Sequence, residues 1–351
     1  MYKRQLGGLT SIAQTAHFGL VDDRVLPRDN AVVLANEQIR TRFSGREGSP
    51  VEILLRNPSA NQLIKYTHDL SELDNVVRVQ SPAGITQNGV LDTGYAPYFT
   101  NYRNDGFVRV QAIIDVDSRS TDGFNLVQEV RDIDTKIQYV KVGGAAGVYT
   151  DSLLGISDNL PMALIWLALT TLILLFLFTG SVILPIKAVL LNLLSLGATL
   201  GFVTWVFQEG HLRWLIGDFQ VTGTIDASTM VLIAVMAFGL SMDYELFLLS
   251  RIKEQHDRGL STTDSVSFGL QHSGRIITAA ALVLAVSFYA FTTSGVSIMK
   301  MLGLGVAFAI LLDATVVRAL LVPALMRLFG DANWWAPKWL KWVYKKVGLD
   351  H

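Results

Sequence analysis

The sequence predicts a polytopic α-helical membrane protein that carries an α/β domain before its membrane part. Half of the 351 residues are hydrophobic and 17% are charged, whereas a soluble protein usually carries about a quarter. The charge is unevenly placed, since residues 1–158 hold 19 of the 30 acidic residues and residues 159–351 hold 11. Five long apolar stretches follow residue 159. A water-compatible module therefore precedes a charge-poor one.

Residues 1–18 precede the α/β domain and contain no complete spanning helix. A multi-spanning protein normally begins with an export signal or a first spanning helix. We therefore expect residues 1–18 to be a truncated or artefactual segment, and the chain to be a fragment of a longer gene product.

Residues 19–158 predict one α/β domain. Alternation of apolar and polar residues indicates strands, helical spacing indicates helices, and Ser59 is a good N-cap for one of them. Strand, helix and strand follow one another twice, which favours a ferredoxin-like arrangement of βαβ units. The expected strands are 51–55, 76–80, 107–115 and 137–142, and the expected helices are 31–43, 59–73 and 121–136.

Residues 159–330 predict five transmembrane helices. The first stretch, 160–178, has no charged residue and is long enough to span a bilayer. A large soluble core is the alternative, but these helices lack the polar faces that it would require. The other stretches are 182–207, 228–250, 276–294 and 301–329.

Basic residues predict the orientation of these helices. The connections opposite the α/β domain carry most of them, while the domain-side loops carry only Arg213 and Lys300. The positive-inside rule then puts the α/β domain outside the cell and residues 331–351 in the cytoplasm as an amphipathic tail at the membrane surface. The opposite side holds Lys187, Arg251, Lys253, Arg258, Arg275, Arg327, Lys338, Lys341, Lys345 and Lys346.

Asp243 is an ionisable residue within the third apolar stretch, and Tyr244 follows it directly. A charge at the centre of a spanning helix costs roughly 2.5–3.5 kcal/mol, so such residues usually mark an ion path. Hydrocarbon favours the neutral carboxyl group, which suits proton uptake and release. The Tyr244 hydroxyl can donate to the carboxylate, and Gly239 allows close approach of another helix. The alternative is a structural hydrogen bond between helices. Glu245 is expected to pair with a basic loop residue.

Asp313 and Arg318 are charged residues within the fifth apolar stretch. We expect a structural ion pair, either between the two or with Arg275. An intramembrane aspartyl protease would need Asp243 and Asp313 as catalytic residues, but that class pairs Tyr-Asp with Gly-x-Gly-Asp, and neither is present. A receptor or scaffold that does not transport is a further alternative.

Several classes of function are disfavoured by composition. The net charge of −1 leaves no basic face for nucleic acid, and the absence of cysteine excludes disulfides and thiol chemistry. The six histidines are scattered, and no phosphate-binding GxxxxGK[ST] motif occurs. We therefore expect no metal, no organic cofactor and no enzymatic activity.

Four motifs resemble those of the MMPL transporters of the resistance–nodulation–division (RND) superfamily. The longest is GLSMDYELFLLSR at 239–251, and a weaker likeness lies at 24–27 and 42–45. The resemblance runs from about residue 20 onward. The other motifs are TAAA at 278–281, LLDATVVR at 311–318 and NWWAP at 333–337.

This resemblance implies the second repeat of such a transporter, without its first helix. Residues 19–158 would be an extracytoplasmic porter domain, and a missing N-terminal half would be the partner. Members move lipids or other hydrophobic molecules out of the bacterial plasma membrane, powered by the proton gradient. Asp243 would be the protonation site and Tyr244 its partner, although members carry one such pair per repeat and this chain has only one.

Overall fold

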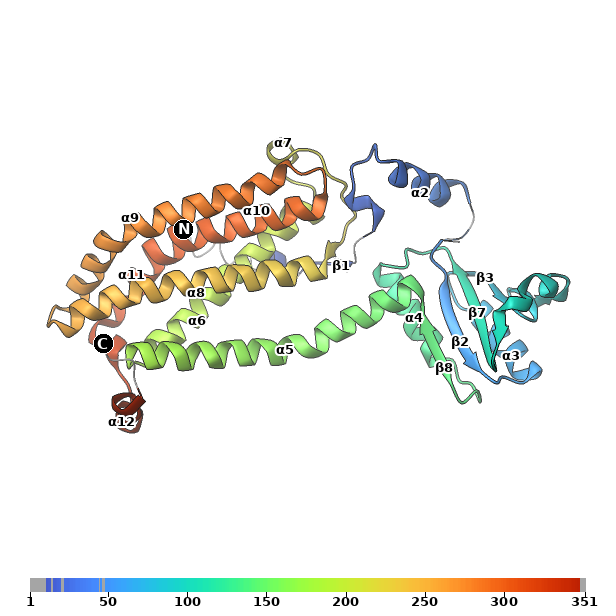
Figure 1. Ribbon diagram of the computed structural model, residues 1–351, viewed down its shortest axis with the longest axis horizontal. Coiled ribbons are helices and arrows are strands. Elements are labelled where there is room, and N and C mark those ends of the chain that lie inside the picture. The colour runs from blue at the N-terminus through green and yellow to red at the C-terminus, as the bar shows by residue number, and fades with distance from the viewer. Residues whose placement is uncertain (1–10, 14, 20–21, 44, 46–47, 348–351) are drawn as a thin grey trace. The chain divides into compact units, whose positions relative to one another are not determined.

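The computed structural model describes residues 11–13, 15–19, 22–43, 45 and 48–347. Most of the segment expected to be truncated or artefactual, residues 1–10 and 14, lies outside this range, as does Ser44 of the 42–45 motif. The chain forms two compact units, one of residues 17–159 and one of residues 160–347 with the described residues before His17 (Figure 1). Each unit has its own core and is described by itself.

The first unit is built on an antiparallel sheet with two helices on one face. Its central strands lie in the order β3-β7-β2-β8, so the third strand of the double βαβ repeat lies between the first two. Ile53 is paired with Val110 and Val79 with Ala112. This is the split βαβ order that the sequence predicts. The elements are β2 Val51–Arg56, α3 Ala60–Ser71, β3 Val76–Ser81, β7 Phe107–Ile114, α4 Thr121–Asp132 and β8 Val140–Gly143.

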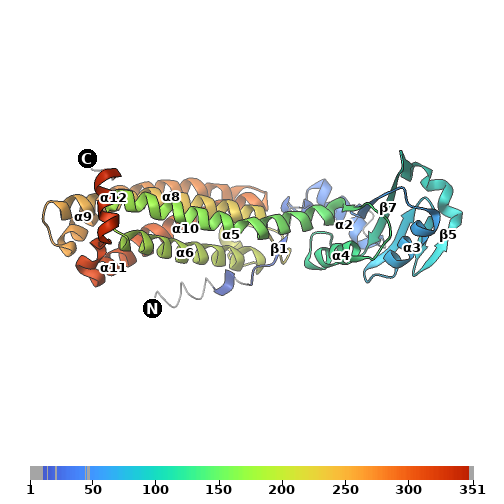
Figure 2. The ribbon, with the colours of Figure 1, turned by 90° about the horizontal axis from the view of Figure 1, so that it is seen from below.

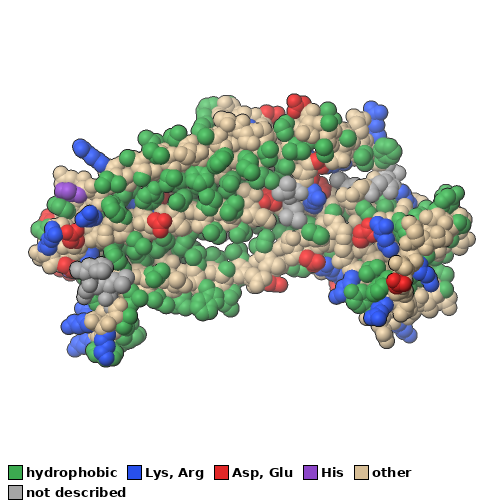
Figure 3. Space-filling model, in the orientation of Figure 1, with side chains coloured by type: hydrophobic (Ala, Val, Ile, Leu, Met, Phe, Trp, Pro, Cys, Tyr) green, Lys and Arg blue, Asp and Glu red, His purple; other side chains and the backbone are tan. Residues whose placement is uncertain are grey.

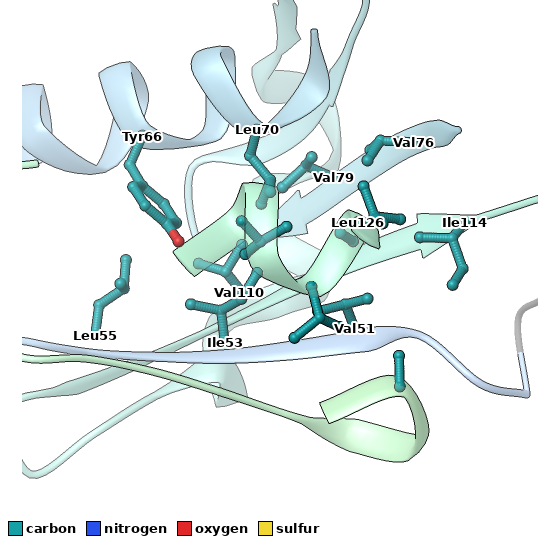
Figure 4. Close-up of a cluster of buried hydrophobic side chains, with 14 of the residues drawn as sticks. Val51, Ile53, Leu55, Tyr66, Leu70, Val76, Val79, Val110, Ile114 and Leu126 are labelled. Atoms are coloured by element: carbon teal, nitrogen blue, oxygen red, sulfur yellow. The ribbon is translucent and has the colours of Figure 1, made fainter. Parts of the chain in front are cut away.

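The core of this unit lies between the sheet and the two helices. Val51, Ile53 and Leu55 alternate along β2 and point towards α3, from which Tyr66 and Leu70 meet them (Figure 4). Ser59 and Gln62 form a capping box at the start of α3, as the expected N-cap requires. Burial of these hydrocarbon side chains stabilises the unit by the ordinary hydrophobic effect.

The Gly- and Asn-rich stretch after β3 contains elements that the sequence did not predict. β4 and β5 form a hairpin, and its turn residues Asn88 and Gly89 both have positive φ, as a tight primed turn requires. The remaining elements of the unit are β1 Phe18–Gly19, η1 Asp23–Val25, α2 Ala31–Arg42, β4 Gly84–Gln87, β5 Val90–Asp92, η2 Thr93–Tyr102 and β6 Arg103–Asn104.

Among the described residues, five helices are long and apolar enough to cross a membrane, and their apolar parts lie in the second unit. They are longer than the apolar stretches in the sequence, because the polar residues that flank an apolar stretch can continue the same helix outside the hydrocarbon layer. Figures 1 and 2 show α6, α8, α9 and α10 running side by side. The spans are α5 Gly144–Thr179, α6 Ile183–Val203 with η3 Thr204–Gln208, α8 Ala227–Asp257, α9 Thr262–Tyr289 with η4 Ala290–Thr293, and α10 Ser297–Leu312 with η5 Asp313–Leu321, α11 Val322–Phe329 and η6 Gly330–Trp334.

The outer surface of the helical unit is apolar. Large hydrophobic side chains are exposed along its helices, and Figure 3 shows many green areas over the face in view. Such a surface suits hydrocarbon rather than water. Examples are Ile165, Trp166, Leu190, Val235, Leu282, Val283 and Val286. Shorter elements of the unit are α7 Arg213–Ile216, β9 Ile225–Asp226 and α12 Lys338–Val347.

Candidate functional site

A cluster of polar side chains is buried inside the helical unit, where α6, α8 and η5 meet. Each of its five members is less than a tenth exposed. Two carboxyl groups and one guanidinium group in this position are unusual, because removing a charge from water costs several kcal/mol unless it is paired. The members are Asn192 of α6, Ser241 and Glu245 of α8, and Asp313 and Arg318 of η5.

The π-helical segment η5 brings Asp313 and Arg318 together. In an α-helix, residues five positions apart point about 140° away from each other. The wider π turn, which closes its hydrogen bonds at five residues, puts both side chains on one face. Arg318 Nη2 lies 2.6 Å from Asp313 Oδ2. The partner of Asp313 is thus Arg318 and not Arg275, which is exposed on α9.

Ser241 links this ion pair to α6. Its hydroxyl oxygen lies 2.8 Å from Asp313 Oδ1 and 2.6 Å from Asn192 Oδ1. A hydroxyl group has one proton, so Ser241 donates to only one of these two acceptors at a time. Its backbone carbonyl accepts a hydrogen bond from Arg318 Nη2. The Ser241 hydroxyl can therefore switch between two partners without movement of a helix.

Glu245 lies one helical turn after Ser241 and completes the cluster. Asn192 Nδ2 donates to Glu245 Oε2 at 3.4 Å, and the charges of Arg318 and Asp313 act on the carboxyl group. The expectation that Glu245 pairs with a basic loop residue is therefore wrong. Residues 241 and 245 share one face of α8, and that face points into the bundle.

A small cavity extends from Glu245 towards the start of α6. It is lined by Glu245, Lys187 and apolar side chains of α6, α8 and α11, and it has room for about one water molecule. The Lys187 ammonium donates to the Asn333 side chain and lies 4.8 Å from the Phe329 ring centre. Lys187 is thus a polar neighbour of the buried cluster on the side of this cavity.

Tyr244 touches the cluster through its ring. The Arg318 guanidinium carbon lies 5.1 Å from the centre of the Tyr244 ring, a cation–π contact. Arg318 Nη1 is buried and has no hydrogen-bond acceptor within the described part of the chain. The guanidinium therefore keeps both N–H donors of Nη1 without an acceptor among the described residues.

Asp243 and Gly239 lie on the outer face of α8, one turn apart. Asp243 is exposed, and no described residue forms a hydrogen bond with its carboxyl group. A Cβ atom added at Gly239 would meet no atom within 4 Å, so no helix in the described part of the chain makes the close approach expected there. The structure thus places Tyr244 against the buried cluster. Its neighbour Asp243 lies on the face of α8 opposite to the cluster residues Ser241 and Glu245.

Sequence reasoning found the charged members Asp313 and Arg318 but missed the role of Asn192, Ser241 and inward-facing Glu245. Uncharged Asn and Ser do not stand out within an apolar run. The signal available was the i, i+4 spacing of Ser241 and Glu245, which puts both on the face opposite Asp243.

Comparison with known proteins identifies the family of this chain. The model of the MMPL family matches residues 24–343. The chain belongs to the MMPL family. This family lies within the RND superfamily, and five membrane-length helices agree with a multi-pass protein of the bacterial membrane.

Three relatives illustrate the likeness of this MMPL chain. The trehalose monomycolate exporter MmpL3 of Mycolicibacterium smegmatis is 36% identical over 339 residues, which is 94% of this chain and 32% of the relative. MmpL3 of Mycobacterium tuberculosis is 46% identical over 211 residues, 60% of this chain and 22% of the relative. The heme uptake protein MmpL11 of M. tuberculosis is 40% identical over 211 residues, again 60% and 22%. The chain spans a third or less of the length of these relatives.

Proposed function

We propose that this chain forms the second half of a proton-driven MMPL transporter that exports lipids or other hydrophobic molecules across the bacterial plasma membrane. Membership of the MMPL family supports a transporter. Two of the relatives above are exporters of trehalose monomycolate, a lipid, which supports a hydrophobic cargo. The chain spans about a third of the M. smegmatis relative, which agrees with one repeat of a larger transporter.

The observation that carries this proposal is the pair Gly239 and Asp243 on the outer face of α8. The same face carries Leu232 and Val235, which are exposed and apolar. A carboxyl group on a lipid-facing surface would cost roughly 2.5–3.5 kcal/mol. A second helix bundle that packs at Gly239 and offers a polar group to Asp243 removes this cost. We assign that bundle to the N-terminal half of the transporter.

In this proposal Asp243 takes up and releases the transported proton. Tyr244 is the hydrogen-bonding partner that Asp243 gains in the assembled transporter, and in this structure the Tyr244 ring lies on Arg318 of the buried cluster. Neutralising Asp243 changes the field at Arg318, on which both Asp243 and Tyr244 act. The Ser241 hydroxyl can then change its acceptor between Asp313 and Asn192. About 1.4 kcal/mol is available per tenfold proton ratio, and about 2.3 kcal/mol per 100 mV.

We further propose where each part of the chain lies relative to the plasma membrane. Residues 19–158 form the porter domain outside the plasma membrane, residues 159–330 form the membrane domain, and residues 331–351 lie in the cytoplasm. The supporting observation is the excess of Lys and Arg in the connections opposite the α/β unit. The proton gradient is the energy source, so the proposal needs no organic cofactor.

The test uses the parent transporter, containing both halves, in vesicles with an imposed pH gradient and a fluorescent lipid as cargo. Asp243→Asn keeps size and polarity but cannot exchange a proton, so we expect transport to fall to background with unchanged expression and folding. Tyr244→Phe keeps the ring on Arg318 but removes the hydroxyl group that we propose bonds Asp243 in the assembled transporter, so we expect about a 10- to 100-fold slower rate.

The matched control is Asp257→Asn at the far end of α8, where Asp257 pairs with Lys253 at the surface. We expect this variant to transport at the normal rate. Normal transport by Asp243→Asn would refute the assigned role and would favour a receptor or scaffold.

A further inference from the structure

The helix α12, Lys338–Val347, has a surface that neither the bundle nor the proposed proton relay uses. Its four lysines, Lys338, Lys341, Lys345 and Lys346, are all exposed, and no described acidic residue pairs with them. The helix contains no acidic residue. Trp339 and Trp342 are 67% and 60% exposed. In Figure 3 this region shows blue and green side chains together, below the left end of the bundle.

The Tyr344 side chain holds α12 against the bundle. The Tyr344 hydroxyl accepts a hydrogen bond of 2.8 Å from Lys253 Nζ, near the end of α8. The Tyr344 ring packs edge-on against Phe176 of α5, with ring centres 6.2 Å apart. It also lies on Gly180, where a Cβ atom would come within 3.0 Å of the ring and where φ is +68°. The contact therefore needs glycine at position 180.

These contacts fix the level of α12 along the bundle. The first and third apolar stretches end at 178 and 250, and Tyr344 touches Phe176, Gly180 and Lys253 close to these two ends. The ends of such apolar stretches lie near the surface of the bilayer, where Trp and Lys are the favoured side chains. The helix α12 is thus held at the depth of lipid headgroups.

The helical period sorts the side chains of α12 into two faces. With 100° per residue, Lys338, Lys341 and Lys345 lie within an arc of about 60°. The opposite face carries Trp339, Leu340, Val343, Tyr344 and Val347. An apolar face beside a lysine face is the pattern of a helix that lies in the plane of a membrane interface.

We propose that α12 binds the headgroups of anionic phospholipids, with its apolar face in the acyl boundary and Lys338, Lys341 and Lys345 on the phosphates. The occupant is a negatively charged lipid surface, because lysines without acidic partners among the described residues and exposed tryptophans occur together at headgroup depth. Each lysine near such a surface raises the affinity roughly fivefold. This site is independent of the assignment of Asp243, and it requires only that the five helices span a bilayer.

The absence of native cysteine makes a direct test possible, since one introduced thiol can be labelled without background. The full chain with Val347→Cys, labelled with nitrobenzoxadiazole, is reconstituted in phosphatidylcholine vesicles containing 0 to 30% phosphatidylglycerol. Val347 is 60% exposed and lies on the apolar face. We expect emission to shift to the blue and to rise about twofold as the anionic fraction increases, and 0.5 M salt to reverse this.

The charge variant is Lys338→Gln, Lys341→Gln and Lys345→Gln together, which should lose at least half of this response. The matched control is Lys65→Gln, Lys136→Gln and Lys141→Gln, three exposed lysines of the α/β unit, which should keep it. Equal emission with and without phosphatidylglycerol would overturn the proposal, as would an unchanged response in the charge variant. A label that responds only after another protein is added would assign α12 to a protein partner instead.

Discussion

The two units of this chain bury different kinds of side chain. In the α/β unit the fully buried side chains are mainly hydrocarbon, as at Val51 and Leu70, and the charged pair Glu52 and Arg109 lies at the surface. In the helical unit a carboxylate and a guanidinium are buried, while residues such as Trp166 and Val283 are exposed.

The difference follows from the solvent around each unit. Water drives apolar side chains inward, so the α/β unit gains stability from every buried methyl group. Lipid offers no such driving force between helices, so packing and polar contacts hold the helical unit together. The same type of ion pair should therefore matter far more at Arg318 than at Arg109. Three substitutions, one in the helical unit and two in the α/β unit, test this contrast between the units.

The largest effect is expected for Arg318→Met in the helical unit. It leaves Asp313 and Glu245 buried without their cation, which should lower the free energy of unfolding by about 3–5 kcal/mol. All seven Trp residues of the chain lie beyond residue 159, so Trp fluorescence during unfolding by sodium dodecyl sulfate reports this unit alone.

The matched control for this prediction is Arg275→Met, at an exposed position on α9, with an expected change within about 0.5 kcal/mol. Adding Asp313→Asn to Arg318→Met should recover part of the loss, because one buried charge is then removed. A loss below about 1 kcal/mol for Arg318→Met would contradict the view that the buried pair stabilises the bundle.

A similar but somewhat smaller effect is expected in the other unit for Leu70→Ala. The Leu70 side chain is fully buried against the sheet, so its truncation should cost about 2–5 kcal/mol. A single cysteine at the buried position Ala112 gives the readout, through its reaction with a maleimide during urea unfolding. Ile64→Ala, on the exposed side of the same helix, should cost less than about 1 kcal/mol; equal losses for the two would mean that α3 does not pack as described.

The smallest effect is expected for the surface pair. Burial opposes ionisation of Glu52, but hydrogen bonds from Arg109 and Gln111 outweigh it and hold the pKa of the Glu52 carboxyl below its ordinary value. The resulting stability is present above the ordinary pKa of about 4.3 and is lost as pH falls through the lowered folded-state value. For a partly exposed pair this amounts to less than about 1 kcal/mol.

The cysteine at position 112, read with 2,2′-dithiodipyridine because this reagent still reacts with thiols in acid, measures this pH dependence between pH 7 and pH 3. Glu52→Gln should flatten the loss of stability at low pH, whereas Glu129→Gln, at an exposed position of α4, should leave it unchanged. An identical pH profile for the unaltered chain and Glu52→Gln would show that the hydrogen bonds to Arg109 and Gln111 do not stabilise the unit.

Much of the fold could be predicted because local patterns determine it. The strands at 51–56 and 107–114 alternate clearly, and Ser59 caps the next helix as its sequence context indicates. The hairpin at β4 and β5 was missed, because short strands within a Gly-rich stretch carry too few apolar residues to show alternation. The ends of the spanning helices were also missed, since α9 begins at Thr262, well before its apolar stretch.

The site could be predicted only in part. A charge in an apolar run stands out, so the cluster members Asp313 and Arg318 could be predicted from sequence, while the role of Asp243 stays a prediction. The π segment that joins the last two depends on packing against α6 and α8, and no local pattern encodes it. The inward direction of Glu245 was likewise decided by which face of α8 packs, which is a tertiary property.

The central claim is that the carboxyl group of Asp243 carries the proton that drives transport. The most direct measurement traps a pH-sensitive dye inside vesicles that contain the parent transporter and records proton entry when lipid cargo is added. We predict cargo-dependent acidification for the unaltered protein and for Asp257→Asn, and none for Asp243→Asn. Acidification at the unaltered rate in Asp243→Asn would contradict the claim.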